Sequence, residues 1–329
     1  MARASDQPAP AELGAGAVRT LAARRGVLRR WPALDLASPK NQHKLGYLLL
    51  LPAVVMIFLI IIYPLILSVD LSFQDVKIAR IGAERKDFTL ENYQRLFASA
   101  EFWRSCWVTL KLVVTVTAAC FVIGMSTALL LNQAFRGRTL ARLLVALPWA
   151  IPEVVAVVIW WWIFDSSFGV MNWLLVTSGL ADRPIGWFSS PGSAFLVVSV
   201  VMIWKGYPFV SIMLLAGLQA IPEDLYQAAR VDGANAWNRF IHITLPCLSP
   251  VLGVTLVLVM LWIFRDFSII YVLTQGGPVG ATQTLAIMTY EQAFGFYKMG
   301  YGAAIGVVTL ILCAIASRFL VRRTAESIY

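Results

Sequence analysis

Charged residues are scarce in this chain. They make up 14% of its 329 residues, while 59% are hydrophobic, whereas roughly 25% of the residues of a soluble domain are charged. This composition excludes an ordinary water-soluble globular protein. Histidine and cysteine are also rare, with two and four residues, and their spacing fits neither a metal site nor a disulfide framework. We therefore expect no bound metal.

Nucleotide-binding and catalytic motifs are missing as well. The sequence has no G-x-x-x-x-G-K-[ST] phosphate loop, which ATP hydrolysis by the common route requires. No nucleophile–base pair is visible either. The chain is therefore predicted to be no enzyme, with no catalytic residue and no cofactor of its own.

The net charge of the chain is +9, which would suit a nucleic-acid partner. In an apolar chain, however, a basic excess is more typical of the cytoplasmic loops of a membrane protein. We therefore expect no nucleic acid and a lipid environment.

Six apolar runs are long enough to cross a bilayer, whose hydrocarbon core of roughly 30 Å takes about 20 helical residues. The predicted spans are 45–68, 105–131, 143–164, 194–219, 247–273 and 300–320. They predict an all-α, polytopic membrane protein. Its parts are a basic N-terminal arm (1–44), a transmembrane domain (45–323) and a short tail (324–329).

Lysine and arginine are unevenly distributed between the predicted connecting segments. With the N-terminus in the cytoplasm, the inner segments hold sixteen of them and the outer segments eight. Because cytoplasmic loops carry the excess of these residues, both termini are predicted to be cytoplasmic.

The inner loop between the fourth and fifth spans, residues 221–246, carries helix signals. Pro222 suits a first helical position, and Glu223 and Asp224 complement the positive end of a helix dipole. Gly233 predicts the end of that helix or a bend in it. We expect a helix, a break and a second short helix with one apolar face. Such a face suits a groove in a partner or a membrane surface.

This loop resembles the E-A-A-x-x-x-G-x9-I-x-L-P signature of the membrane subunits of binding-protein-dependent ABC importers. The positions that correspond are Gln227, Ala228, Ala229, Gly233, Ile243, Leu245 and Pro246. Only Gln227 departs, since the family usually has Glu there. Further motifs are similar to the sugar-importer branch, which includes the maltose and glycerol phosphate permeases. They are L-P-W-A-I-P at 147–152, W-x-G-Y-P at 204–208 and L-T-x-G-G-P at 273–278.

The resemblance implies a type I ABC importer transmembrane domain in a bacterial inner membrane, which imports a sugar or a sugar derivative. The implied partners are a second homologous permease, two ABC ATPase subunits that bind ATP and Mg, and an extracytoplasmic solute-binding protein. The loop would be a coupling helix that docks on an ATPase. Its coupling residues would be Gln227, Ala228, Ala229, Asp232, Gly233, Ile243, Leu245 and Pro246.

Polar residues inside the apolar spans indicate where a solute crosses, because they are costly in a bilayer. Glu153 lies in the third span, residues 205–209 are expected to interrupt the fourth, and Asp266 lies in the fifth. The resemblance implies sugar contacts at Lys205, Gly206, Phe209, Val259, Trp262, Ile263 and Asp266.

Alternatives remain at this stage. Lys205 and Arg265 suit an anionic sugar, or an internal ion pair with Asp266 that only braces the helices. Trp262 suits either a sugar ring or packing. Glu153 and Asp266 also suit a secondary transporter, which an ion gradient would drive without an ATPase.

Overall fold

A computed structural model describes residues 42–74 and 88–326, without the side chains of 42–45 and 323–326. Most of the predicted basic arm, residues 1–41, and residues 327–329 of the predicted tail lie outside the described residues. Within the described ranges every regular element is a helix, so the all-α prediction is confirmed. The chain divides at Pro64 into two compact units.

The first unit contains helix α2 (Gln42–Ile57) and a π-helical segment η1 (Phe58–Ile62). The helix continues through α3 (Tyr63–Ser72). Residues Gly46–Ser72 together form an uninterrupted helix that is long and apolar enough to cross a membrane. From Tyr47 to Ile62 the side chains are exposed, as expected for a segment that lipid would cover.

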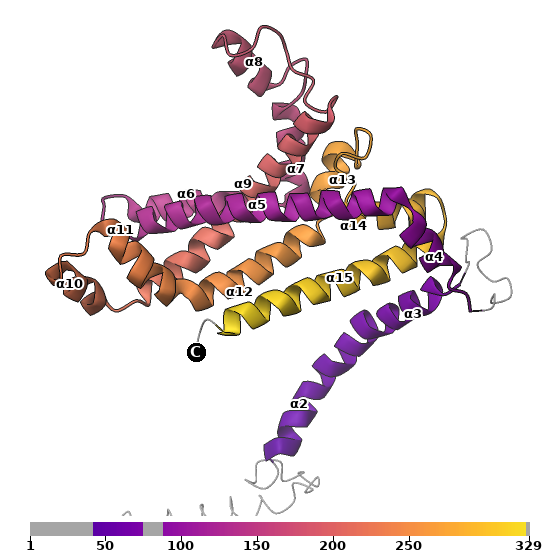
Figure 1. Cartoon of the computed structure of the whole chain (residues 1–329), viewed down its shortest axis with the longest axis horizontal. Helices are drawn as coiled ribbons and strands as arrows, with labels where there is room; N and C mark the ends of the chain where they lie inside the picture. The colour runs from indigo at the N-terminus through magenta and orange to yellow at the C-terminus, as the bar shows by residue number, and fades with distance from the viewer. Residues whose placement is uncertain (1–41, 75–87, 327–329) are drawn as a thin grey trace, which may run out of the picture. The chain divides into compact units, whose positions relative to one another are not determined.

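The second unit contains four long helices that run side by side (Figure 1), with α5 against α9, and α12 against α5, α9 and α15. Its elements are α4 (Glu91–Ala98), α5 (Ala100–Asn132), α6 (Arg138–Ala150), α7 (Glu153–Ile163), α8 (Val170–Thr177), α9 (Pro191–Gln219), α10 (Glu223–Val231), α11 (Ala236–Arg239), η3 (Phe240–Thr244), α12 (Leu245–Phe264), α13 (Ser268–Thr274), α14 (Leu285–Tyr290), η4 (Glu291–Gly295) and α15 (Met299–Glu326).

All six predicted spans have a helical counterpart. Five helical stretches of the described residues are long and apolar enough to cross a membrane, and the pair α6 and α7 provides a sixth if it is one broken span. The helices of this pair are bent by 94° relative to each other. Ile151 and Pro152 at the bend have extended ψ angles of 134° and 136°. Pro152 accounts for the extended conformation of Ile151, because a proline disfavours the helical conformation of the residue before it.

The predicted interruption of the fourth span is wrong. Helix α9 is continuous from Pro191 to Gln219 and contains Pro208 in its interior. A proline removes one backbone donor, but here tight packing on α5 holds the helix on both sides of it. The fifth predicted span is interrupted instead, since α12 ends at Phe264 and α13 begins at Ser268.

The expected helix, break and short helix of the 221–246 loop are confirmed. Helix α10 begins at Glu223, one residue after Pro222, and ends at Val231. Gly233 has a φ of +80°, which is left-handed and turns the chain into α11.

The contact between α5 and α9 depends on a glycine. A Cβ atom at Gly124 would lie 2.7 Å from Cγ1 of Val210, whose side chain is completely buried. Because Gly124 has no side chain, the backbones of α5 and α9 can approach each other closely, as they do at small residues in membrane helix pairs.

Gly124→Ala is therefore expected to destabilise the protein by about 1–3 kcal/mol through overpacking. The matched control is Gly192→Ala on α9, where a Cβ would meet nothing within 4 Å. Thermal unfolding of both variants in detergent tests this expectation. Equal midpoints for the two variants would contradict the close packing at Gly124.

Candidate functional site

A cavity of about 430 Å³ lies where the two helix breaks of the second unit meet. Its walls come from α5 and α9, from the α6–α7 break and from the α12–α13 break. Six of the seven residues predicted to contact a sugar line it: Lys205, Gly206, Val259, Trp262, Ile263 and Asp266. The seventh, Phe209, is not part of the lining, but its ring lies 4.6 Å from that of Trp262.

The ammonium group of Lys205 is held by the last carbonyls of α6 and by the bend that follows. It donates to the carbonyl oxygens of Pro148 at 2.9 Å and Trp149 at 3.2 Å, and also to that of Ile151. These carbonyls lie at the negative end of the α6 dipole, which favours a cation. An ammonium group has three donors, so these bonds use all of them.

Lys205 does not form the ion pair with Asp266 that was one alternative. Within the described residues, ion pairs link Arg95 to Glu91 and Arg230 to Glu223, and neither pair lies at the cavity. The partners of Lys205 are backbone carbonyls instead.

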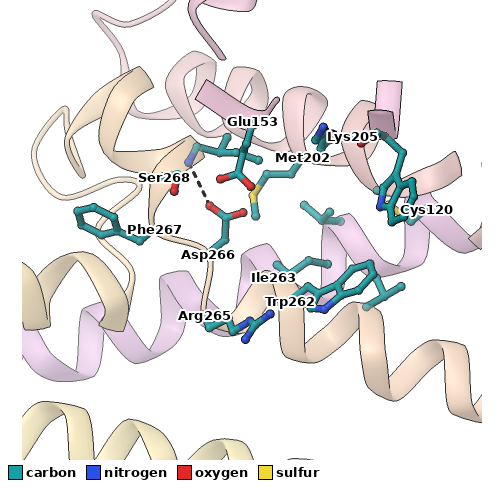
Figure 2. A pocket seen from close by; sticks show the side chains of 15 residues that line it. Cys120, Glu153, Met202, Lys205, Trp262, Ile263, Arg265, Asp266, Phe267 and Ser268 are labelled. Atoms are coloured by element: carbon teal, nitrogen blue, oxygen red, sulfur yellow. Dashed lines mark hydrogen bonds between the residues drawn. The ribbon is translucent and has the colours of Figure 1, made fainter. Parts of the chain in front are cut away.

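Two carboxylates face each other across the cavity, those of Glu153 and Asp266 (Figure 2). Each lies at the start of a helix, Glu153 in the first turn of α7 and Asp266 just before α13. Oδ1 of Asp266 accepts a hydrogen bond from the backbone N–H of Ile269 at 3.2 Å. The oxygens of both carboxyl groups can accept hydrogen bonds from hydroxyl groups.

Aromatic rings form another wall of the cavity. The indole of Trp262 contacts the ring of Phe209, which lies 6.5 Å from the ring of Trp149. Trp149 and Trp262 both line the cavity. Arg265 also lines it and is exposed, and its side chain extends away from the two carboxylates (Figure 2).

Several lining residues were not among the predicted contacts. Glu153 and Arg265 are charged residues within predicted spans, and Trp149 belongs to the L-P-W-A-I-P motif. The sequence does not distinguish Val116, Cys120 and Met202 as cavity residues, because they are apolar residues within apolar runs. The remaining three, Phe267, Ser268 and Ile269, reach the cavity through the unpredicted break after α12.

The predicted coupling residues lie on a different surface, at the end of the long helices where Figure 1 shows α10 and α11. Helix α10 has no buried residue, and the apolar side chain of Val231 is 88% exposed. The hydroxyl groups of Tyr226 and Thr244 are 3.0 Å apart, which ties α10 to η3. Exposed residues of the predicted set are Gln227, Ala228, Asp232, Gly233 and Pro246, while Ala229, Ile243 and Leu245 are half-buried. The described residues contain no group of three or more potential metal ligands.

Comparison with known proteins identifies the family. The family described as "Binding-protein-dependent transport system inner membrane component" matches residues 121–325. The chain belongs to this family. It is thus a multi-pass permease subunit, which is the membrane component of its transport system and not a catalytic subunit.

Individual relatives are similar over most of the chain. The trehalose/maltose transport system permease protein MalF of Thermococcus litoralis is 40% identical, over 83% of this chain and 90% of its own. The sulfoquinovosyl glycerol transport system permease protein SmoG of Agrobacterium fabrum is 36% identical, over 91% of this chain and 96% of its own. A solved bacterial alginate ABC transporter, in complex with a periplasmic protein that binds an alginate pentasaccharide, has a TM-score of 0.73 at 25% identity, over 87% of this chain and 94% of its own. The resemblance found in the sequence and the ABC importer architecture are thereby confirmed.

Lys205→Met is expected to destabilise the protein by about 1–3 kcal/mol, because it leaves partly buried carbonyls of the bend without donors. Lys205→Arg retains a cation with several donors and is expected to recover part of this loss. Thermal unfolding in detergent is the measurement. A Met variant with unchanged stability but no solute uptake would instead show that Lys205 serves the solute directly.

Proposed function

We propose that this chain is the permease subunit of an ATP-driven importer for a sugar or a sugar derivative, delivered by an extracytoplasmic binding protein. The observation that carries the proposal is the cavity at the two helix breaks, which combines aromatic rings with carboxylate acceptors. Aromatic rings suit the apolar face of a sugar ring, and the carboxylates suit its hydroxyl groups.

The proposed contacts are Gly206, Val259, Trp262, Ile263 and Asp266, which line the cavity. Phe209 would support Trp262 from behind, and Lys205 would position the α6–α7 bend. Arg265 has no side-chain hydrogen bond within the described ranges, and it would hold an acidic substituent such as a sulfonate or a uronate. The named substrates of the relatives, trehalose/maltose and sulfoquinovosyl glycerol, define the first sugars to test.

We propose the inner membrane of a bacterium as the location, with both termini in the cytoplasm. The proposed assembly contains a second homologous permease and two ABC ATPase subunits, which would bind ATP and Mg. Residues 221–246 would dock on an ATPase through the exposed surface of α10. The described part of the chain provides a direct path from there to the cavity, since α12 begins at Leu245 next to η3 and ends at Phe264 beside the cavity.

The mechanism proposed for this path is a shift between two states of the helix bundle. Closure of the ATPase dimer on ATP would move α10, and the Tyr226–Thr244 contact would transmit the movement to α12. ATP can shift the bundle only by the difference between its interaction free energies with the two states. The exposed surface of α10 is where that difference would act on this chain.

Uptake in proteoliposomes tests the proposed function. The chain is reconstituted with its partner permease, its ATPase and its binding protein, and labelled trehalose, maltose and sulfoquinovosyl glycerol are supplied. We expect uptake of at least one sugar that requires ATP and the binding protein. Accumulation by the chain alone under a proton or sodium gradient would support the secondary transporter with Glu153 and Asp266 as ion sites.

Gly233→Pro tests the coupling segment. Proline holds φ near −65°, whereas Gly233 has a φ of +80°, so the turn between α10 and α11 cannot form. We expect the variant to remain in the membrane but to lose co-purification of the ATPase. Gly179→Pro is the control, because Gly179 also has a left-handed φ, of +72°, but lies outside residues 221–246, so this variant is expected to keep ATPase binding. Unreduced ATPase binding by the Gly233→Pro variant would refute the docking role.

A further inference from the structure

Four aromatic side chains form a continuous row that begins at the cavity. Phe267 lines the cavity, and its ring centroid lies 4.8 Å from that of Tyr271 and 4.8 Å from that of Tyr290. The ring of Tyr290 is 5.0 Å from that of Tyr271 and 5.4 Å from that of Phe294. Phe294 ends the row at the surface, with 55% of the residue exposed. We call these four residues the aromatic row.

Two neighbouring helical segments build the aromatic row. Phe267 and Tyr271 are four residues apart at the start of α13, and Tyr290 and Phe294 are four residues apart where α14 passes into η4. This spacing places each pair on one side of its helix. The ring of Phe267 points away from Glu153 and Asp266 (Figure 2), so the row leads out of the cavity.

Core packing accounts for only the inner half of the row. Phe267 and Tyr271 pack against the larger of the two hydrophobic clusters found in the described residues, whereas Tyr290 and Phe294 belong to neither. The exposed residues Phe296 and Tyr297 follow directly after the row. Exposed aromatic surface of this kind marks a ligand-binding groove, a membrane interface or a protein–protein contact, and the continuity of the row with the cavity favours the first of these.

We infer that the aromatic row is a binding track along which a sugar ring enters the cavity. This inference rests on the proposed function. The ring of Phe294 contacts that of Tyr290, which in turn contacts those of Phe267 and Tyr271, so a pyranose that leaves Phe294 meets Tyr290 and then Phe267 at the cavity. The hydroxyl groups of Tyr271 and Tyr290 can donate to sugar oxygens and accept from sugar hydroxyls. The segment between α13 and α15 is extracytoplasmic in the predicted topology, so the track leads inward to Asp266, the neighbour of Phe267.

The test compares sugar transfer with ATP hydrolysis in the complete reconstituted transporter. Tyr290→Leu and Phe294→Leu remove a ring but keep an apolar side chain, while Tyr290→Phe keeps the ring. With labelled trehalose, or another sugar of the panel that the wild type imports, we expect the leucine variants to transport about fivefold less sugar per ATP. Tyr290→Phe is expected to stay within twofold of the wild type. Phe135→Leu is the control for an exposed ring outside the row.

The outcomes separate the track from the proposed function. A wild type that imports none of the sugars with ATP refutes both. A wild type that imports one, with leucine variants that keep its sugar-to-ATP ratio, refutes the track alone. A parallel fall of uptake and of ATPase activity in these variants also refutes it, because that result would indicate a packing role.

Chemical labelling gives a second measurement that does not depend on uptake. Tyr290→Cys is expected to react with a membrane-impermeant thiol reagent added from the extracytoplasmic side, and trehalose or the imported sugar is expected to slow the reaction. Ile287→Cys, which replaces a completely buried residue of the same helix, is expected to remain unlabelled, as peptide mass analysis can show. A Tyr290→Cys variant that does not react, or that reacts at the same rate with the sugar, overturns the track.

Discussion

A helix that breaks inside a membrane has to satisfy the backbone groups that the break sets free, because lipid offers them no partner. This constraint shapes the second unit. At the α6–α7 bend, the ammonium of Lys205 donates to three backbone carbonyls and, within the described residues, to no carboxylate. At the α12–α13 break, the carboxylate of Asp266 accepts the N–H of Ile269. Lys205 and Asp266 are therefore, first of all, hydrogen-bond partners of the two interrupted helices.

The same two breaks place the chemistry of the candidate site. Each break starts a new helix at the cavity, α7 with Glu153 and α13 with Asp266, and the two carboxylates consequently face each other. The break after α12 also turns the chain so that Phe267 begins the aromatic row. Because α12 continues from the segment around α10, movement at the surface of α10 would reach this break through one helix. Helix α12 and the break that follows it thus connect the proposed coupling surface, the cavity and the proposed entry track.

Sequence reasoning was accurate where a single helix or a local motif decides the outcome. Apolar runs located five long helices and the bent pair of α6 and α7, and Pro222 and Gly233 bounded α10 to within a residue or two. It failed where packing decides. The W-x-G-Y-P motif predicted a break around Pro208, yet α9 stays helical there because α5 packs closely against it at Gly124. The break in the fifth span carries no proline or glycine and was therefore missed.

The amino-acid sequence by itself determined that the chain is an all-helical membrane protein of a recognisable permease family, because hydropathy and motif spacing are properties of the chain alone. It also indicated most of the charged and aromatic residues at the cavity. Only the tertiary structure decided which helices break and what each charge does. Lys205 illustrates the reason: its partners lie 54 to 57 residues away along the chain, and nothing local in the sequence shows that three backbone carbonyls will meet at its ammonium group.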